Sequence, residues 1–447
     1  MENELFEKAP VHKAYLKLAM PVVLGMVVSL VYNMVDTWFI ARTGDTSLVA
    51  GVSLCAPVFS LMLAFGDIFG LGASSVISRL FGAKQYEESS HVHAFSFYTA
   101  LGWSLVCALV MLVFKNPILR LLGAKEDTFA SASAYYTWLA VGAPAIILSL
   151  VPNNTLRTEG LAFPAMIGTI IGSVLNIILD PIFIFTLGLG AAGAAIATVL
   201  SNAVTVILYI VVLLKKSKNL SIKLSDYKAS ASDIGQLFAI GLPASITNLM
   251  QSFAIMMTNR YLLPYGTDKI AALGIAMKVN MIVILTMVGF AFGGQPLYGY
   301  SYGAGNTDRL KKTLRFALTV ELTFSVVMTA LFILLAPGII RIFIKDPAVV
   351  SSGTQILRAL VVSMPLMGVI LVLTTLFQSA GKALPAFILS LSRQGLVLLL
   401  MLILLSALFG YYGVIYAQAA SDLITCLISV ILTKTSHVFT KPALKST

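Results

Sequence analysis

The chain alternates between long apolar blocks and short polar or glycine- and proline-rich segments. The blocks are about 20 to 30 residues long, the length a helix needs to cross a hydrocarbon layer about 30 Å thick. Because a helix satisfies its own backbone hydrogen bonds in lipid, the pattern predicts membrane-spanning helices. We expect twelve spans, over residues 14–41, 48–80, 91–115, 131–153, 161–187, 192–215, 233–263, 270–303, 312–336, 354–378, 384–408 and 413–434.

The twelve predicted spans form two similar sets of six. Matching residues recur at an offset of 220 to 222: Pro21 with Pro243, Gly72 with Gly293, Pro144 with Pro365, Pro164 with Pro385, and Ser201 with Ser421. Because each half has an even number of spans, both halves enter the membrane from the same side. The pattern predicts an all-α polytopic membrane protein of 12 transmembrane helices, in two pseudo-symmetric six-helix bundles (a 6+6 parallel repeat) around a central cavity. The predicted domains are residues 1–216, a cytoplasmic linker at 217–232, and residues 233–447.

Composition excludes a soluble fold, since 58% of the residues are hydrophobic and 11% are charged, against roughly 25% charged in soluble domains. The net charge of +11 does not indicate nucleic-acid binding, because the basic residues lie in loops between spans. With both termini cytoplasmic, 19 basic residues fall inside and 9 outside, as the positive-inside rule requires. The acidic start predicts no removable signal peptide. The three cysteines lie in apolar blocks and indicate no disulfide framework.

Polar side chains inside the first six spans gather at one depth. Asp36, Asp180 and Thr198 are each five to seven residues from the predicted outer ends of their spans, and Asn176 lies one turn before Asp180. A charged residue inside a span costs about 2.5 to 3.5 kcal/mol and needs a reason. An oxygen-rich cage here could hold Na⁺ or share a proton between two carboxylates. Alternatively, the acids only hydrogen-bond neighbouring helices.

The internal repeat helps to distinguish a coupling role for these acids from a role in holding the helices together. The positions that match this cluster in the second half carry no acid: they are Thr258, Val397, Met401 and Gln418. Residues that only hold a bundle together would be expected in both halves, whereas a coupling site is needed once. The comparison therefore favours a coupling role.

The second half carries different polar residues. Arg393 and Asp422 both lie near mid-membrane and are predicted to form a structural ion pair. A stripe rich in Met and Phe packs against lipid and helices, or forms a plastic apolar cavity wall; the candidate cavity-lining residues are Met256, Met257, Lys278 and Met281. No metal-ligand spacing, nucleophile elbow or P-loop is present, so the sequence supports neither an enzyme nor an ATP-driven pump.

Four segments together resemble the bacterial branch of the multidrug and toxic compound extrusion (MATE) transporters: Phe6–Pro10, Ala19–Pro21, Ser78–Ala83 and Asn176–Pro181. The resemblance covers nearly the whole chain. It implies two six-helix lobes and export of lipophilic, often cationic compounds driven by Na⁺ or H⁺. It also implies that helix 1 bends at Pro21, and that the cation or proton site comprises Asp36, Asn176, Asp180, Thr198 and the backbone carbonyl of Ala194.

The sequence therefore predicts a cation-coupled multidrug efflux antiporter working by alternating access in the cytoplasmic membrane of a bacterium. Its expected partners are small lipophilic or cationic drugs, the coupling ion and the lipid bilayer, with no other cofactor, and we expect a monomer. A flippase for a lipid-linked glycan or other amphiphile is the alternative. A passive channel or membrane scaffold is a third class.

Overall fold

The computed structural model describes residues 2–440, and this part of the chain consists of helices and connections without a strand. Within these described residues, eleven helical segments are long and apolar enough to cross a membrane. A twelfth span arises if α13 (Pro347–Val361) and α14 (Met364–Ser379), bent by 42° at their junction, count as one. The predicted all-α, twelve-span architecture is confirmed.

The tenth span differs in detail from its prediction as one helix over 354–378. It begins earlier and is broken at residues 362–363. Pro365 lies in the first turn of α14, where its missing N–H costs nothing. The residue before a proline avoids the helical region, so a continuous helix is disfavoured at this point.

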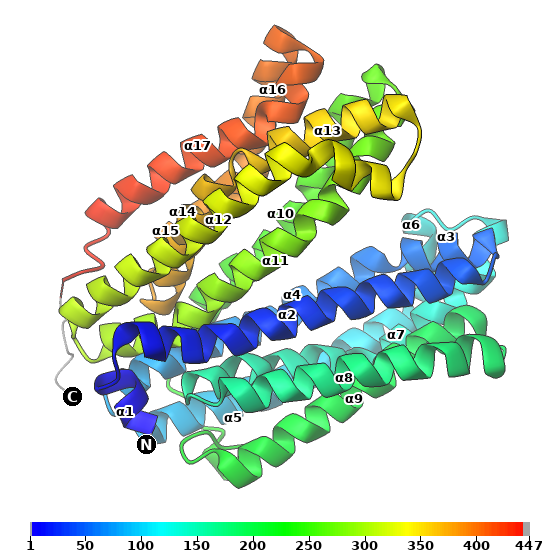
Figure 1. Cartoon of the computed structure of the whole chain (residues 1–447). Coiled ribbons are helices and arrows are strands. Elements are labelled where there is room, and N and C mark those ends of the chain that lie inside the picture. The colour runs from blue at the N-terminus through cyan, green and yellow to red at the C-terminus, as the bar shows by residue number, and fades with distance from the viewer. Residues whose placement is uncertain (1, 441–447) are drawn as a thin grey trace. The chain divides into compact units, whose positions relative to one another are not determined.

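The chain packs as two compact units, each described here separately. The amino-terminal unit is Leu24–Ser245. Besides the second part of α2 (Val11–Arg42) and the first part of α10 (Ala231–Leu262), it contains α3 (Thr46–Leu54), α4 (Ala56–Gly82), α5 (Tyr86–Val113), α6 (Lys115–Leu121), α7 (Glu126–Thr158), α8 (Ala162–Pro181), η1 (Ile182–Thr186), α9 (Gly190–Lys216) and η2 (Leu224–Asp226) (Figure 1). Helix α7 lies at its centre and packs against α4, α5 and α9.

The carboxyl-terminal unit joins the chain up to Val23 with the chain from Ile246 onward. Besides the remaining parts of α2 and α10, it contains α1 (Glu2–Glu7), η3 (Leu263–Tyr265), α11 (Thr267–Gly303), α12 (Thr307–Phe343), α13, α14, α15 (Ala383–Leu391), η4 (Ser392–Leu396), α16 (Val397–Phe409) and α17 (Tyr411–Thr435). Its apolar core lies among α10, α11, α12, α13, α14, α16 and α17.

Helices α2 and α10 each contribute to both units, and matched glycines allow this. In the carboxyl-terminal unit, a Cβ on Gly293 would lie 2.2 Å from Cα of Ala19 in α2. In the amino-terminal unit, a Cβ on Gly72 would lie 2.4 Å from the carbonyl oxygen of Leu237 in α10. Only glycine permits backbones to approach this closely. The repeated glycines therefore mark where the first helix of one repeat packs on the second helix of the other.

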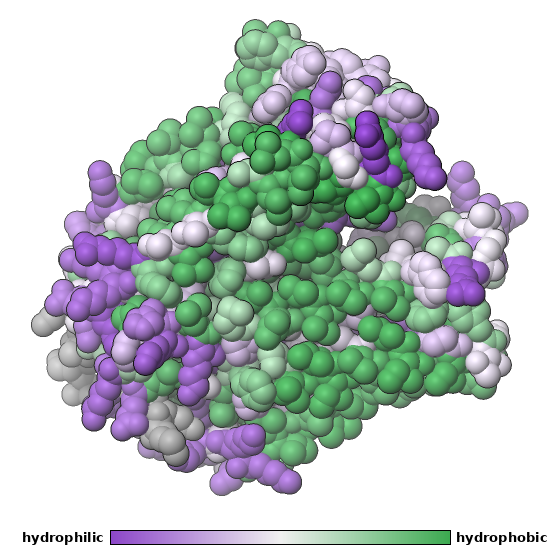
Figure 2. Space-filling model, viewed as in Figure 1, coloured by the Kyte–Doolittle hydropathy of each residue, from purple (hydrophilic) through white to green (hydrophobic). Residues whose placement is uncertain are grey.

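The helix flanks are coated with apolar side chains, while hydrophilic residues gather at helix ends (Figure 2). On α12, for example, Leu334 is 75% exposed and Val327 is 58% exposed. Water would make so many exposed apolar residues costly, whereas lipid tails accommodate them. The fold is that of a multi-pass membrane protein.

Candidate functional site

Two of the predicted polar residues lie on the buried face of α8. Asp180 is fully buried and Asn176, one turn earlier, is nearly so. Directly after Asp180, Pro181 ends the regular helix and η1 continues as a π-helical turn. Such turns disturb the regular hydrogen-bond ladder and are frequent at functional sites.

The carboxyl group of Asp36 in α2 lies within hydrogen-bonding reach of the carboxyl group of Asp180. Each group has one buried oxygen, Oδ1, with no hydrogen-bond donor among the residues that the structure describes. Two carboxylates in contact, one fully buried at Asp180 and one half-buried at Asp36, repel one another when both are charged. The pair is therefore suited to hold a proton or a small cation between them.

A neutral polar chain extends from this pair to α9. Oriented to satisfy both neighbours, the Asn176 amide donates Nδ2–H to Oδ2 of Asp180 at 3.2 Å, and its oxygen accepts the backbone N–H of Thr198 at 3.2 Å. The Thr198 hydroxyl donates to the carbonyl oxygen of Ala194 at 3.1 Å. Side chains from α2, α8 and α9 thus converge with one backbone carbonyl, all within the amino-terminal unit.

Two cavities in the amino-terminal unit border this cluster. One, of about 300 Å³, is lined by Asp36 and Tyr135; the other, of about 240 Å³, is lined by Asn176 and Asn202. Thr198 lines both, so the cluster separates two spaces that a small ion or part of a ligand can occupy.

Further polar side chains, which were not predicted from the sequence, lie beside the cluster. Tyr32, one turn before Asp36, lines both cavities, and Asn202 lies one turn after Thr198, whose carbonyl accepts its amide at 2.8 Å. Both are spaced by one helical turn from a predicted site residue, and that spacing was the available signal.

The donor set is made of oxygen atoms. Carboxylate, amide, hydroxyl and carbonyl oxygens suit a hard cation such as Na⁺. Over residues 2–440, no group of three or more His, Cys, Asp or Glu side chains is arranged to hold a metal ion.

The site residues predicted in the second half lie in the carboxyl-terminal unit. Arg393 and Asp422 form an ion pair, with Nε 2.9 Å from Oδ1. Met256, Lys278 and Met281 are exposed, and Met257 is partly buried against the core of the carboxyl-terminal unit. Their role as cavity-lining residues stays a prediction.

Pro21 lies inside the continuous helix α2, close to the residue at which this helix passes from one unit to the other. A proline inside a helix removes one backbone hydrogen bond and weakens the helix there. The conformational role assigned to Pro21 also stays a prediction.

Comparison with known proteins shows similarity along the whole chain. The sequence profile of the MatE family matches twice, over residues 21–182 and 243–403. The multidrug export protein MepA of Staphylococcus aureus is 32% identical over 428 residues, which cover 96% of this chain and 94% of that protein. The protein of the same name from Staphylococcus haemolyticus is 30% identical over the same shares.

Solved structures of the same kind of transporter are also similar to this chain. A MATE protein in complex with MaL6 has a TM-score of 0.92 at 28% identity, with 97% of each chain covered. An outward-facing multidrug resistance MATE family transporter of the MOP superfamily has a TM-score of 0.91 at 28% identity, also with 97% of each chain covered. The two profile matches also support the internal repeat, because one profile fits each half.

Proposed function

Because the chain belongs to the MatE family of membrane transporters, we propose that it is a multidrug efflux antiporter that exchanges Na⁺ or H⁺ for small lipophilic, often cationic compounds. Its proposed place is the cytoplasmic membrane of a bacterium, with both termini inside. The export of drugs is suggested by the relatives named above. The coupling to a cation is argued from the cluster in the amino-terminal unit.

The observation that carries the coupling proposal is the contact between the carboxyl groups of Asp36 and Asp180. Two acids in contact away from bulk water change charge state easily, because a proton or a cation relieves their repulsion. Asn176 and Thr198, together with the carbonyl of Ala194, supply neutral oxygens beside them. The cluster can therefore gain and lose one positive charge without large rearrangement of its neighbours.

Exchange follows if the cation and the drug favour different conformations of the protein. In the proposed cycle, cation entry at Asp36 and Asp180 favours a bend of α2 at Pro21, a point where the helix lacks one hydrogen bond. Asp36 and Pro21 lie on the same helix, so a change at the carboxylates acts on the bend directly. The bend reduces the space available to the drug, which then leaves.

The experiment is gradient-driven ethidium transport in proteoliposomes, with Na⁺ and pH gradients imposed separately. We expect Asp36→Asn and Asp180→Asn each to remove the dependence of transport on the gradient. The matched control is Asp127→Asn, because Asp127 is exposed in the first turn of α7 and away from the cluster. Response to one gradient alone identifies the coupling ion.

Unchanged gradient-driven efflux in both cluster variants would eliminate the coupling assignment while leaving export intact. Absence of any ethidium flux in the wild-type protein, with folding verified, would instead contradict the drug-export proposal. A flux of lipid-linked glycan in the same liposomes would favour the flippase alternative.

A further inference from the structure

A basic cavity of about 630 Å³ lies in the carboxyl-terminal unit, between the end of α12 and one side of α13. Its lining includes three cationic side chains, Arg341, Lys345 and Arg358, and no carboxylate. The polar side chains of Ser351, Thr354 and Gln355 and the apolar ones of Pro337, Pro347 and Val350 complete the lining. This composition favours an anionic ligand over a cationic drug.

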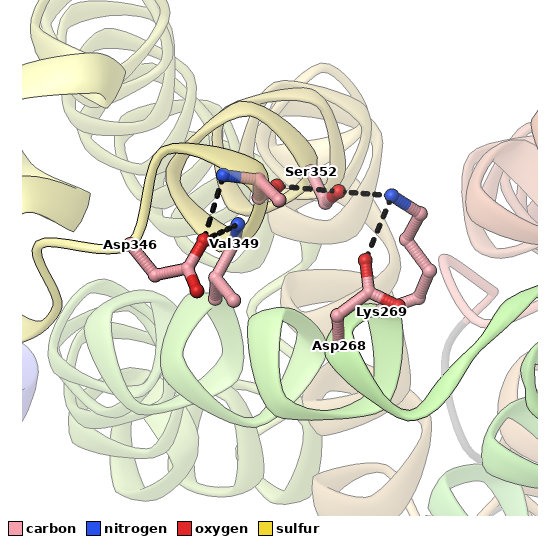
Figure 3. Close-up of polar contacts among 6 residues, drawn as sticks. Asp268, Lys269, Asp346, Val349 and Ser352 are labelled. Atoms are coloured by element: carbon pink, nitrogen blue, oxygen red, sulfur yellow. Dashed lines mark hydrogen bonds and ion pairs between the residues drawn. The ribbon is translucent and has the colours of Figure 1, made fainter.

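The three cations have no carboxylate partner within the part of the chain that the structure describes. Within residues 2–440, no carboxylate lies within 4.0 Å of Arg341, Lys345 or Arg358. Asp346, which follows Lys345 in the chain, accepts the backbone N–H of Val349 and so caps α13 (Figure 3). Its carboxylate is thereby used for the helix terminus.

Lys269, in contrast to the three cations of the cavity, has a carboxylate partner. Lys269 at the start of α11 contacts Asp268 at 3.0 Å and donates to the hydroxyl of Ser352 in α13 (Figure 3). It is both paired and used to tie α11 to α13. The exposed cations of the cavity, Arg341 in α12, Lys345 in the connection and Arg358 in α13, have no such carboxylate partner among the described residues.

Arg358 is held in place by a defect in α12. Pro337 has no N–H, so the carbonyl of Ile333, four residues earlier, lacks its helical donor. Arg358 Nε donates to that carbonyl oxygen at 3.0 Å. This bond uses one of five guanidinium N–H groups, so the terminal amino groups are left for a ligand in the cavity.

The cavity lies at the end of an exposed apolar stripe on α12. Val327, Leu331 and Leu334 are 58%, 43% and 75% exposed. They follow one face of α12 at helical spacing and lie about 10 to 21 Å from Arg341 along the axis, toward the middle of the span. A molecule with an anionic head and long apolar chains fits both the cavity and the stripe.

We infer that this cavity binds the phosphate headgroup of an anionic phospholipid, whose acyl chains lie along the exposed stripe of α12. Three unpaired cations favour a headgroup of net negative charge, while the ammonium of a zwitterionic lipid is repelled. Basic pockets between spanning helices are a recurrent way to hold such headgroups. Neither the drug nor the coupling ion is part of this site.

The test measures lipid affinity by native mass spectrometry of the purified chain in detergent, titrated with phosphatidylglycerol or phosphatidylcholine. We expect tighter binding of phosphatidylglycerol to the wild type. Arg341→Gln/Lys345→Gln should weaken it about thirtyfold, the factor that two basic contacts of ordinary strength supply. Arg358 is left intact because it supports α12. Lys345→Gln alone, beyond the end of α12, should weaken binding about fivefold.

The repeat provides a matched control. Arg120 and Lys125 stand at the positions of Arg341 and Lys345 in the first half, but Thr137 stands where Arg358 is. Arg120→Gln/Lys125→Gln should therefore leave the lipid affinity unchanged. The inference is overturned if the Arg341 and Lys345 variants keep full affinity, if the control pair loses as much, or if inorganic phosphate at equal concentration displaces the lipid.

Discussion

The guanidinium Nε of Arg393 lies 2.9 Å from Oδ1 of Asp422, deep in the carboxyl-terminal unit. Ser363 donates to the other carboxylate oxygen at 2.7 Å, and Gln418 donates to Oδ1 at 3.0 Å. Gln418 occupies the repeat position of Thr198. The carboxyl-terminal unit thus pairs its acid with a permanent cation. The amino-terminal unit instead has two acids in its polar cluster, Asp36 and Asp180, with no cationic partner among the described side chains.

Arg393→Gln should strongly destabilise the protein, because it leaves Asp422 buried without a cation. Breaking a buried ion pair from one side typically costs about 3 to 5 kcal/mol. The double variant Arg393→Gln/Asp422→Asn should recover much of the loss, since no charge is then left uncompensated. Thermal unfolding followed by size-exclusion chromatography measures both. Equal melting temperatures for Arg393→Gln and the wild type would contradict a structural role.

Thr198→Val should reduce gradient-driven efflux while the protein stays folded. The substitution keeps the shape of the side chain but removes the hydroxyl that lies beside the acid pair and bonds the Ala194 carbonyl. Thr375→Val is the control, because its hydroxyl makes the same bond to the carbonyl four residues earlier, in the other unit. If both variants transport equally well, the hydroxyl of Thr198 is no ligand.

Gly72→Val and Gly293→Val should each destabilise the protein by about 1 to 3 kcal/mol, the usual cost of overpacking a close contact. In both cases the added side chain meets the backbone of the crossing helix, at 2.4 Å and 2.2 Å from the new Cβ. Gly102→Val is the control, since a Cβ there meets nothing within 4 Å. The melting temperatures of the three variants measure these effects. A lower melting temperature for only one of Gly72→Val and Gly293→Val would contradict the equivalence of the two glycines in the repeat.

The twelve spans could be predicted because length and apolar composition alone decide whether a helix can cross lipid. The break before Pro365 could not be located to the residue, since hydropathy does not change there. Asp36, Asn176, Asp180 and Thr198 could be gathered by depth, because depth follows from residue count. Which neighbours face them depends on how each helix is rotated, and the missed Tyr32 reflects that.

The basic cavity could not be predicted from the sequence. Arg341 and Arg358 are 17 residues apart on different helices, and their convergence depends on the conformation of the connection at residues 344–346. Hydropathy carries no information on that connection. Arg341 follows the predicted span 312–336 and Arg358 lies near the start of the predicted span 354–378, so both lie at the same end of two neighbouring spans, but nothing in the sequence indicates that they share a cavity.

The bond from Arg358 to the carbonyl of Ile333 should be energetically coupled to Pro337. In the wild type, Arg358→Met removes the donor of that carbonyl, at a cost of about 0.5 to 1.5 kcal/mol, the net value of an ordinary hydrogen bond. Pro337→Ala restores the N–H that bonds Ile333 within the helix, so Arg358→Met should then cost little. Melting temperatures of the wild type, both single variants and the double variant, without added lipid, give the coupling as a double-mutant cycle. Additive effects would mean that the arginine does not replace the missing helical donor, whereas a positive coupling would identify Pro337 as the reason the guanidinium is held at the cavity wall.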